Sequence, residues 1–318
     1  MPQNEPYSIP RLPFIQSGYG LSTPFGTLLP PGGRVAAYVR STGIADFDDP
    51  TIAQNLVTTL AAALQRVRTG KGDTIFILPG HSESVVDATM LTNLLAGTKI
   101  IGVGRGSNMP AFRWTATAAQ WALNKADVII SGLRLRLEGA NGVVKAILVT
   151  GADNVLTNCD IEVASGATAK ATIAIELGTG ADRCEITGNI FRGTATNNVT
   201  DGVKVVAAVD QVRIADNEMV FSATAANGLV HFTAAATNTK VLRNYMYNTH
   251  TSSSACLVYD AVAADGIAAD NYYGVLNNGT AASQGATFGA GSLIKCFQSF
   301  TSDEPQKSGA LAPAVVAT

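Results

Sequence analysis

Short apolar segments rich in β-branched residues recur along the chain at a nearly constant spacing. Eight of them begin near positions 72, 99, 127, 153, 182, 210, 238 and 265, so successive starts lie about 27 residues apart, with small variations. Each segment opens with a strand-like stretch, as in "GDTIFILPG" and "DVIISGLRL", passes through a short turn containing Gly, Asn or Asp, and re-enters an apolar pair. A second apolar strand follows in mid-repeat, for example "VVKAILV" (143–149) and "ATIAIEL" (171–177). A period of this length without helical stretches is typical of a β-solenoid.

The pattern predicts an all-β fold, a parallel β-helix of about eight coils with about 27 residues per coil, over residues 72–300. Because neighbouring coils stack about 4.8 Å apart, eight coils would form a rod on the order of 40 Å long. No proline occurs between Ala111 and Glu304, which agrees with an unbroken run of paired strands.

Two other patterns precede the repeats. Seven of the twelve prolines lie in residues 1–31, and we expect residues 1–33 to form an extended, proline-rich arm. Residues 34–71 predict a strand (34–39) and one helix that caps the first coil, with Asp49 as N-cap, Pro50 at the first helical position and Gly70 as the stop. The apolar stripe of this helix consists of Ile52, Leu56, Leu60, Leu64 and Val67.

Two polar series share the repeat period. Asn189, Asn217, Asn244 and Asn271 recur at successive intervals of 28, 27 and 27 along the chain, which predicts a ladder of side-chain amides along the rod. Aspartates start five of the coils, and we expect them to stack at one corner and bond the turn backbone. The alternative is a polysaccharide hydrolase, because carboxylates one coil apart would lie near the separation used by retaining glycosidases. The aspartates are Asp127, Asp153, Asp182, Asp210 and Asp265.

The composition of the chain restricts the classes of partner that it can bind. Charged residues make up 14% of the chain and the net charge is −2, so there is no basic field for DNA, RNA or an anionic membrane. The sequence shows no secretory signal and no apolar run of the length that spans a bilayer, about 18 residues or more. We therefore expect synthesis in the cytoplasm and no membrane segment. Cysteine spacing favours buried thiols over metal binding or a disulfide scaffold. The cysteines are Cys159, Cys184, Cys256 and Cys296.

Other chemistry-bearing residues lack the spacing of a site. "KIIGVGRGSNMPAF" resembles a phosphate loop, but Pro110 and alternating aromatic residues and threonines follow where a phosphate-binding helix would have to start. Gly102, Gly104 and Gly106 therefore predict turns. The histidines have no metal-ligand spacing, and the aromatic residues of the second coil predict core packing over a sugar platform. We therefore predict no catalytic residue, no cofactor and no metal site. The residues concerned are His81, His231, His250, Phe112, Trp114 and Trp121.

The run "GDTIFILPGHSESV…GTKIIGVGRGSNMPAFRW…ADVIISGLRL" resembles the right-handed parallel β-helix proteins of tailed-bacteriophage virions. The resemblance covers about residues 34–300 and implies a right-handed coil behind an N-terminal helix. The chain departs from enzymes of the same fold, because it has neither the Gly-His-Gly of polygalacturonases with neighbouring Asp-Asp nor the calcium-binding aspartates and catalytic arginine of pectate lyases. Residues 301–318 would form an extended C-terminal tail.

Together these features predict a non-enzymatic virion structural protein, a homotrimer that decorates or projects from the capsid. Its partners would be its own copies and the major capsid protein or another virion protein, bound through the N-terminal arm. The alternative is a tailspike that binds or cleaves host-surface polysaccharide. Against cleavage, the basic residues of the coils are scattered, one or two per coil: Arg134, Arg136, Lys145, Lys204, Arg213, Lys240 and Arg243.

Overall fold

The computed structural model describes residues 33–41, 50–137, 141–165, 170–193, 199–224, 227–250, 255–260, 264–276, 284–288, 293–297 and 300–301. The predicted arm and C-terminal tail lie outside these residues except at Gly33 and Thr301, so both stay predictions. Within the described residues, no helix is long and apolar enough to cross a membrane.

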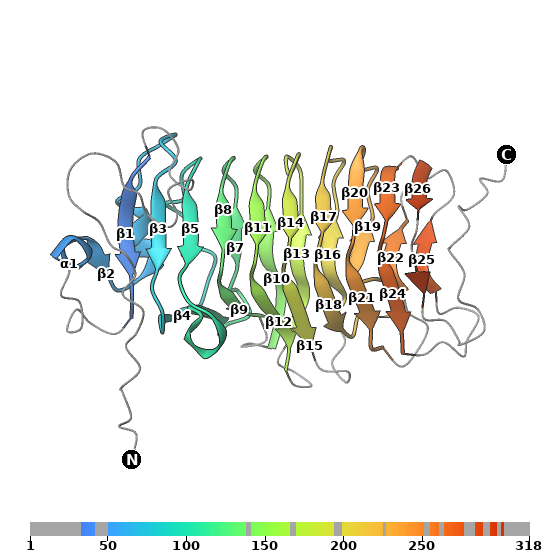
Figure 1. The fold of residues 1–318 in the computed structure, drawn as a ribbon, viewed down its shortest axis with the longest axis horizontal. Helices are drawn as coiled ribbons and strands as arrows, with labels where there is room; N and C mark the ends of the chain where they lie inside the picture. Colours follow the sequence, from blue (N-terminus) through green and yellow to red (C-terminus); the bar gives the residue numbers. More distant parts are fainter. Residues whose placement is uncertain are drawn as a thin grey trace, which may run out of the picture.

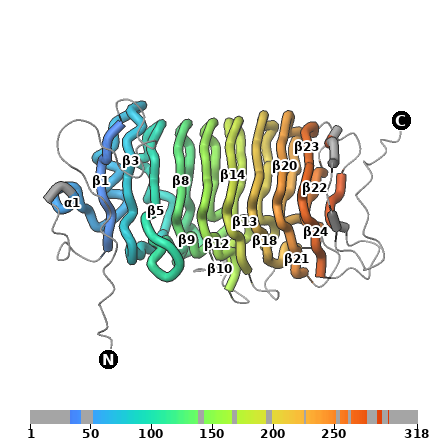
Figure 2. Tube along the Cα trace, viewed as in Figure 1, coloured from blue at the N-terminus to red at the C-terminus, as the bar shows by residue number. Residues whose placement is uncertain are grey.

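The strands stack side by side into a parallel β-solenoid (Figure 1). Successive coils follow the chain in order from the α1 end to the β24 end (Figure 2). The predicted repeat is confirmed, since each of the eight predicted segments contributes a strand to one 11-stranded sheet. Each coil contributes as many as three strands, whereas the sequence pattern predicts two strands and an apolar pair.

The strands form three faces, which we number in chain order. The first face contains β1 (Val35–Val39), β3 (Thr74–Ile77), β5 (Lys99–Gly102), β8 (Ile129–Ser131), β11 (Val155–Thr157), β14 (Glu185–Thr187), β17 (Arg213–Ala215), β20 (Thr239–Leu242), β23 (Asp265–Ala269) and β26 (Leu293–Phe297). The second face contains β4 (Ser82–Val85), β6 (Ala111–Trp114), β9 (Arg134–Arg136), β12 (Asp160–Ala164), β15 (Ile190–Gly193), β18 (Glu218–Phe221), β21 (Tyr245–Asn248), β24 (Tyr272–Val275) and β27 (Phe300–Thr301). The third face contains β7 (Trp121–Leu123), β10 (Asn141–Val149), β13 (Lys170–Leu177), β16 (Asp201–Val205), β19 (Val230–Phe232), β22 (Ala255–Tyr259) and β25 (Gln284–Phe288).

The core consists of columns of apolar side chains that stack from coil to coil. On the first face, for example, Ile75, Ile100 and Ile130 occupy equivalent, fully buried positions. Side chains alternate inward and outward along a strand, so each coil buries one set of residues and presents the other. Burial of these columns is the main stabilising contribution to the rod.

Two corners of each coil are tight turns through the left-handed region of backbone conformation. The corner before the first face has positive φ at Asp127, Asp153, Arg183, Gln211 and Asn238 (52° to 59°). The corner between the first and second faces has positive φ at Gly132, Asn158, Gly188, Asp216, Arg243 and Asp270 (51° to 72°). Asn, Asp and Gly tolerate this conformation best, which explains their recurrence at the turns.

The prediction of one continuous helix is wrong. The segment forms α1 (Pro50–Asn55), β2 (Leu56–Val57) and α2 (Leu60–Leu64). Val57, Thr58 and Thr59 are β-branched and disfavour a helix, and β2 gains backbone partners by pairing with the open edge of β1. Thr59 then caps α2, because its hydroxyl accepts a hydrogen bond from the Ala62 N–H at 3.2 Å.

The break also divides the apolar stripe between two sides of the first face. Ile52 and Leu56 pack with Tyr38 and Phe76 in a small cluster separate from the core, whereas Leu60 and Leu64 of α2 join the core itself. β2 is the last strand at its end of the 11-stranded sheet. The segment therefore does cap the N-terminal edge as predicted. Asp49 lies outside the described residues, and Gly70, with φ of 64°, lies in a later turn.

Candidate functional site

The five predicted corner aspartates do not share one position. The strand register aligns Asp127, Asp153 and Asp265 in one column, and places Asp182 and Asp210 one residue earlier, in the preceding column. The expectation of a single stacked series is therefore wrong. The repeat length varies slightly from coil to coil. The sequence spacing therefore does not show an offset of one residue, because that offset depends on where each turn lies.

Four of these aspartates make contacts with a neighbouring coil. Asp182 and Asp265 accept from the backbone N–H groups of Asp210 and Asn238, so the predicted bonding to turn backbone is confirmed for these two. Asp153 accepts two hydrogen bonds from the guanidinium of Arg183, at 2.6 and 2.7 Å. Asp210 accepts bonds from the Asn238 amide at 2.7 Å and the Thr237 hydroxyl at 2.9 Å. The Arg183 guanidinium lowers the pKa of Asp153, and the Asn238 and Thr237 side chains lower that of Asp210. A glycosidase acid needs the opposite shift.

The second corner holds the same kind of contact. Arg243 binds Asp216 of the preceding coil with two hydrogen bonds, at 2.7 and 2.8 Å, and this lowers the pKa of Asp216. Basic residues that are scattered in the sequence are thus paired with carboxylates in the structure. The further pairs are Arg134–Asp160 (3.6 Å), Arg136–Glu162 (2.8 Å), Lys145–Glu176 (2.7 Å), Lys204–Asp201 (3.0 Å) and Arg213–Glu185 (3.0 Å).

The predicted asparagine ladder is confirmed. Each of its members is at most 2% exposed and follows directly after a left-handed corner residue. The amide of Asn189 donates to Asn217, that of Asn217 to Asn244 and that of Asn244 to Asn271, at 2.9 to 3.1 Å. Each amide also donates to a backbone carbonyl of the preceding coil. The ladder therefore satisfies polar groups inside the solenoid and leaves none of its four amides for a ligand.

The outer surface of the second face combines charges with aromatic rings. Asp160 and Glu162 project from β12 in the two outward columns, and arginines on the adjacent strands pair with them. Farther along the same face, Tyr245 and Tyr272 stack with parallel rings 4.8 Å apart, and Tyr245 is 44% exposed. We call Tyr245, Tyr247 and Tyr272 the tyrosine shelf. Because Tyr245 and Tyr272 cover each other on one ring face, the shelf presents aromatic surface with polar edges, which suits contact with a sugar ring or a protein surface.

The predicted core role of the aromatic residues in the second coil is confirmed. Phe112, Trp114 and Trp121 are fully buried, and the ring of Trp121 lies 4.9 Å from Phe112 and 5.2 Å from Trp114. The ring of His81 lies 5.3 Å from that of Phe112, and its Nε2 lies 3.1 Å from Glu83. Glu83 in turn accepts a hydrogen bond from the Leu60 N–H at the start of α2. This group therefore joins the N-terminal cap to the first two coils.

His231 lies in a charged cluster that the sequence argument missed. Its two ring nitrogens face Asp201 and Asp260, at 2.7 and 2.8 Å. The sequence does contain a signal for this cluster: the two aspartates lie 30 residues before and 29 residues after His231, which is about one coil on each side. Among the described residues, no group of three or more His, Cys, Asp or Glu side chains is placed to hold a metal ion.

The glycine-rich loop has a structural role. Gly104 and Gly106 have positive φ, and the loop ends in a single 3-10 turn at Gly106–Asn108. A Cβ on Gly102 would lie 2.1 Å from the Gly132 carbonyl oxygen of the next coil. The predicted turns are thus confirmed for Gly104 and Gly106, whereas the prediction is wrong for Gly102, which is the last residue of β5.

The prediction of buried thiols is confirmed for Cys159, Cys184 and Cys256, which are at most 2% exposed. Burial raises the pKa of Cys159 to about 12 and that of Cys184 to about 11. The side chain of Cys296 lies outside the described part of the chain.

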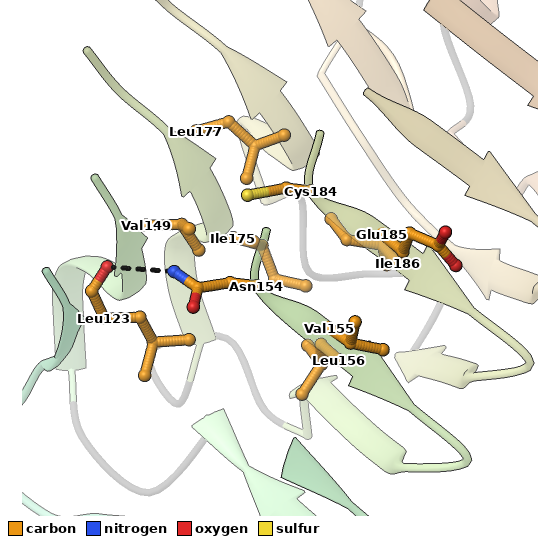
Figure 3. Close-up of a pocket in the computed structure, with 10 residues that line it drawn as sticks. All are labelled: Leu123, Val149, Asn154, Val155, Leu156, Ile175, Leu177, Cys184, Glu185 and Ile186. Carbon is orange, nitrogen blue, oxygen red and sulfur yellow. Dashed lines mark hydrogen bonds between the residues drawn. The ribbon is translucent and has the colours of Figure 1, made fainter. Parts of the chain in front are cut away.

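Figure 3 shows a cavity inside the solenoid between the first and third faces. Its volume is about 10 Å³ and its lining is mainly aliphatic, with Leu123, Val149 and Ile175 among the contributors. The amide of Asn154 points across it toward the Leu123 carbonyl, to which it donates at 3.4 Å. Ligand pockets are usually about 300 Å³ or larger, so this cavity is a packing gap in the core.

No protein-family model, curated protein or solved structure matches this chain. The class that the fold defines is the parallel β-solenoid, and the functional argument below starts from its geometry.

Proposed function

We propose that the protein is a non-enzymatic structural protein of a bacteriophage virion. In this proposal it is a homotrimeric β-solenoid that decorates the capsid or projects from it, attached through residues 1–33. The virion setting is suggested by the sequence resemblance, and the coil geometry supports a scaffold role. We expect the major capsid protein, or another virion protein, to be the partner of the arm.

The use of the corner carboxylates is the observation that carries the proposal. Asp153, Asp210 and Asp216 each bind a side chain of a neighbouring coil, and each has a lowered pKa. Cleavage of a glycosidic bond needs one carboxyl group with a raised pKa that can donate a proton. These carboxylates contribute instead to the attachment of one coil to the next, which is what a rigid rod requires.

The first face supports self-association. One of its outward columns is uncharged from β5 to β23, and we call it the uncharged strip. Burial of this column against a second copy would itself remove no charge from water, and removal of a charge is the largest cost of burying polar surface. The half-buried members of the strip are Ser131, Thr157, Thr187, Leu242 and Ala269, and its buried members are Ile101 and Ala215.

The attachment can be tested with particles assembled without this protein. Full-length protein should bind these particles at a fixed copy number, measured by quantitative mass spectrometry. A chain lacking residues 1–33 should stay folded by circular dichroism but fail to bind, whereas a chain lacking residues 302–318 serves as the control. Full occupancy by the arm-less chain would contradict the proposal, as would a monomeric mass in light scattering.

A second candidate function is binding of a host-surface glycan, and the tyrosine shelf favours it. The shelf lies on the same face as Asp160 and Glu162, so a chain of sugars could contact rings and charged groups together. We expect Tyr245→Ala to abolish binding on a glycan array if this function is present, with the exposed Lys240→Ala as control. Neither the wild-type protein nor either variant should release oligosaccharide from the glycan. Release that disappears in Asp160→Asn or Glu162→Gln would instead establish a hydrolase.

A further inference from the structure

His231 connects three successive coils on the third face. Its Nδ1 lies 2.7 Å from Asp201 Oδ1 in β16, and its Nε2 lies 2.8 Å from Asp260 Oδ2, directly after β22. The side chain of Asp201 is fully buried and that of His231 is 3% exposed, whereas that of Asp260 is 57% exposed. The imidazole is therefore enclosed between a buried carboxylate and a hydrated one.

This geometry requires both ring nitrogens to donate. A neutral imidazole has one N–H, so its other nitrogen would direct a lone pair at a carboxylate oxygen less than 3 Å away. The imidazolium donates to both carboxylates. Burial alone lowers the pKa of His231, but the hydrogen bonds to Asp201 and Asp260 outweigh burial and raise it above the ordinary 6.5.

The surrounding groups complete a balanced set of charges. From β16, Lys204 lies 3.0 Å from the second oxygen of Asp201. Lys204 is aligned between Glu176 of β13 and His231 of β19, and Glu176 pairs with Lys145 of β10 at 2.7 Å. Val258 of β22 is the uncharged neighbour on the other side. With His231 protonated, three cations face three carboxylates, and loss of its proton leaves one carboxylate without a counter-charge.

We propose that His231 is a proton-dependent clamp between coils, and that its deprotonation releases Asp260 while Asp201 stays bound. The remaining proton stays on Nδ1, because the buried Asp201 has no access to water and Asp260 can be hydrated. Release frees the end of β22, where the Asp260 N–H donates to the Phe232 carbonyl at 2.9 Å. The clamp acts within one chain and does not depend on the proposed virion role.

The direction of the pH effect follows from the raised pKa. The clamp stabilises the folded state fully below the unfolded value of 6.5, and this stabilisation is lost as the pH rises through the folded pKa. Histidine is the side chain whose ordinary titration lies in this range. The C-terminal coils should therefore loosen on the alkaline side.

The titration of His231 can be followed directly by NMR of the full-length protein. Imidazole carbon–proton signals recorded between pH 5 and 10 should show one histidine with a midpoint above 6.5, assigned by its absence in His231→Gln. Asp260→Asn should lower this midpoint, and His250→Gln should leave it unchanged. A midpoint at or below 6.5, or one unaffected by Asp260→Asn, would overturn the proposal. If His231→Gln does not fold, loss of the His81 and His250 signals in their own variants assigns the remaining resonance.

Release itself is measured by amide hydrogen exchange over residues 255–260, corrected for the intrinsic effect of pH. In the wild type, exchange here should accelerate above the His231 midpoint. In Asp260→Asn it should be fast at low pH already and gain no further acceleration. Equal protection on both sides of the midpoint in the wild type would show that the histidine titrates without acting as a clamp.

Discussion

Replacement of Asn217 by leucine tests whether the asparagine ladder holds the coils together. The Asn217 Oδ1 accepts from both the backbone N–H and the side-chain amide of Asn189, at 3.0 and 3.1 Å. Its Nδ2 donates to the Ile186 carbonyl at 2.8 Å and to Asn244 at 2.9 Å. Leucine has a similar size but can make none of these four bonds.

The expected cost follows from the groups left behind. Asn244 Oδ1 keeps a partner, because it still accepts from the residue 217 N–H at 3.0 Å. The backbone N–H of Asn189 loses its acceptor in a fully buried place, and each such orphaned group costs roughly 1–3 kcal/mol. With the Ile186 carbonyl also affected and some gain from burying leucine, we expect a loss of about 2–4 kcal/mol.

Urea unfolding followed by circular dichroism measures this loss, with a lower midpoint and an unchanged slope expected. The exposed neighbour Glu218 on β18 provides the control, since Glu218→Gln should alter stability by less than about 0.5 kcal/mol. Asn271→Leu should cost less than Asn217→Leu, because Asn271 has no described ladder partner beyond it. A midpoint for Asn217→Leu equal to that of the wild type would refute the reasoning.

Three further variants or treatments probe other contacts. Arg183→Ala should lower the urea midpoint slightly at pH 7, and the difference should vanish in acid, because the stabilisation from the lowered pKa of Asp153 is lost as the pH falls through it. Gly102→Ala should destabilise by at least about 2 kcal/mol in the same assay, since its methyl group would meet the Gly132 carbonyl. The three described buried cysteines should resist iodoacetamide in the native protein and react after unfolding, as peptide mass spectrometry would show. Rapid native labelling of any of them would contradict their burial.

The repeat and the ladder were predictable because both are local patterns with a period. A coil needs inward apolar residues and a turn at a fixed place, so the same residue types recur once per coil. The same holds for the asparagines, since each of the four directly follows a left-handed corner residue and so recurs with that turn once per coil.

The positions of the aspartates and the contacts of His231 could not be predicted in the same way, because they depend on the register between coils. The connection between the second and third faces varies in length, so the coil spacing by itself leaves an offset of one residue undetermined. That offset separates Asp182 from the column of Asp153. The same ambiguity hides the pairing of His231 with Asp201 and Asp260.

The N-terminal segment shows the second limit of local patterns. Its apolar stripe has helical spacing, but an unpaired edge of β1 lies beside it and competes for its backbone. Repeated local preferences therefore predicted the solenoid and its ladder, because each coil needs the same inward residues and the same turns. Folding in three dimensions alone decided the edge strand β2, the two aspartate columns and the His231 cluster, because these depend on which residues of neighbouring coils come into contact.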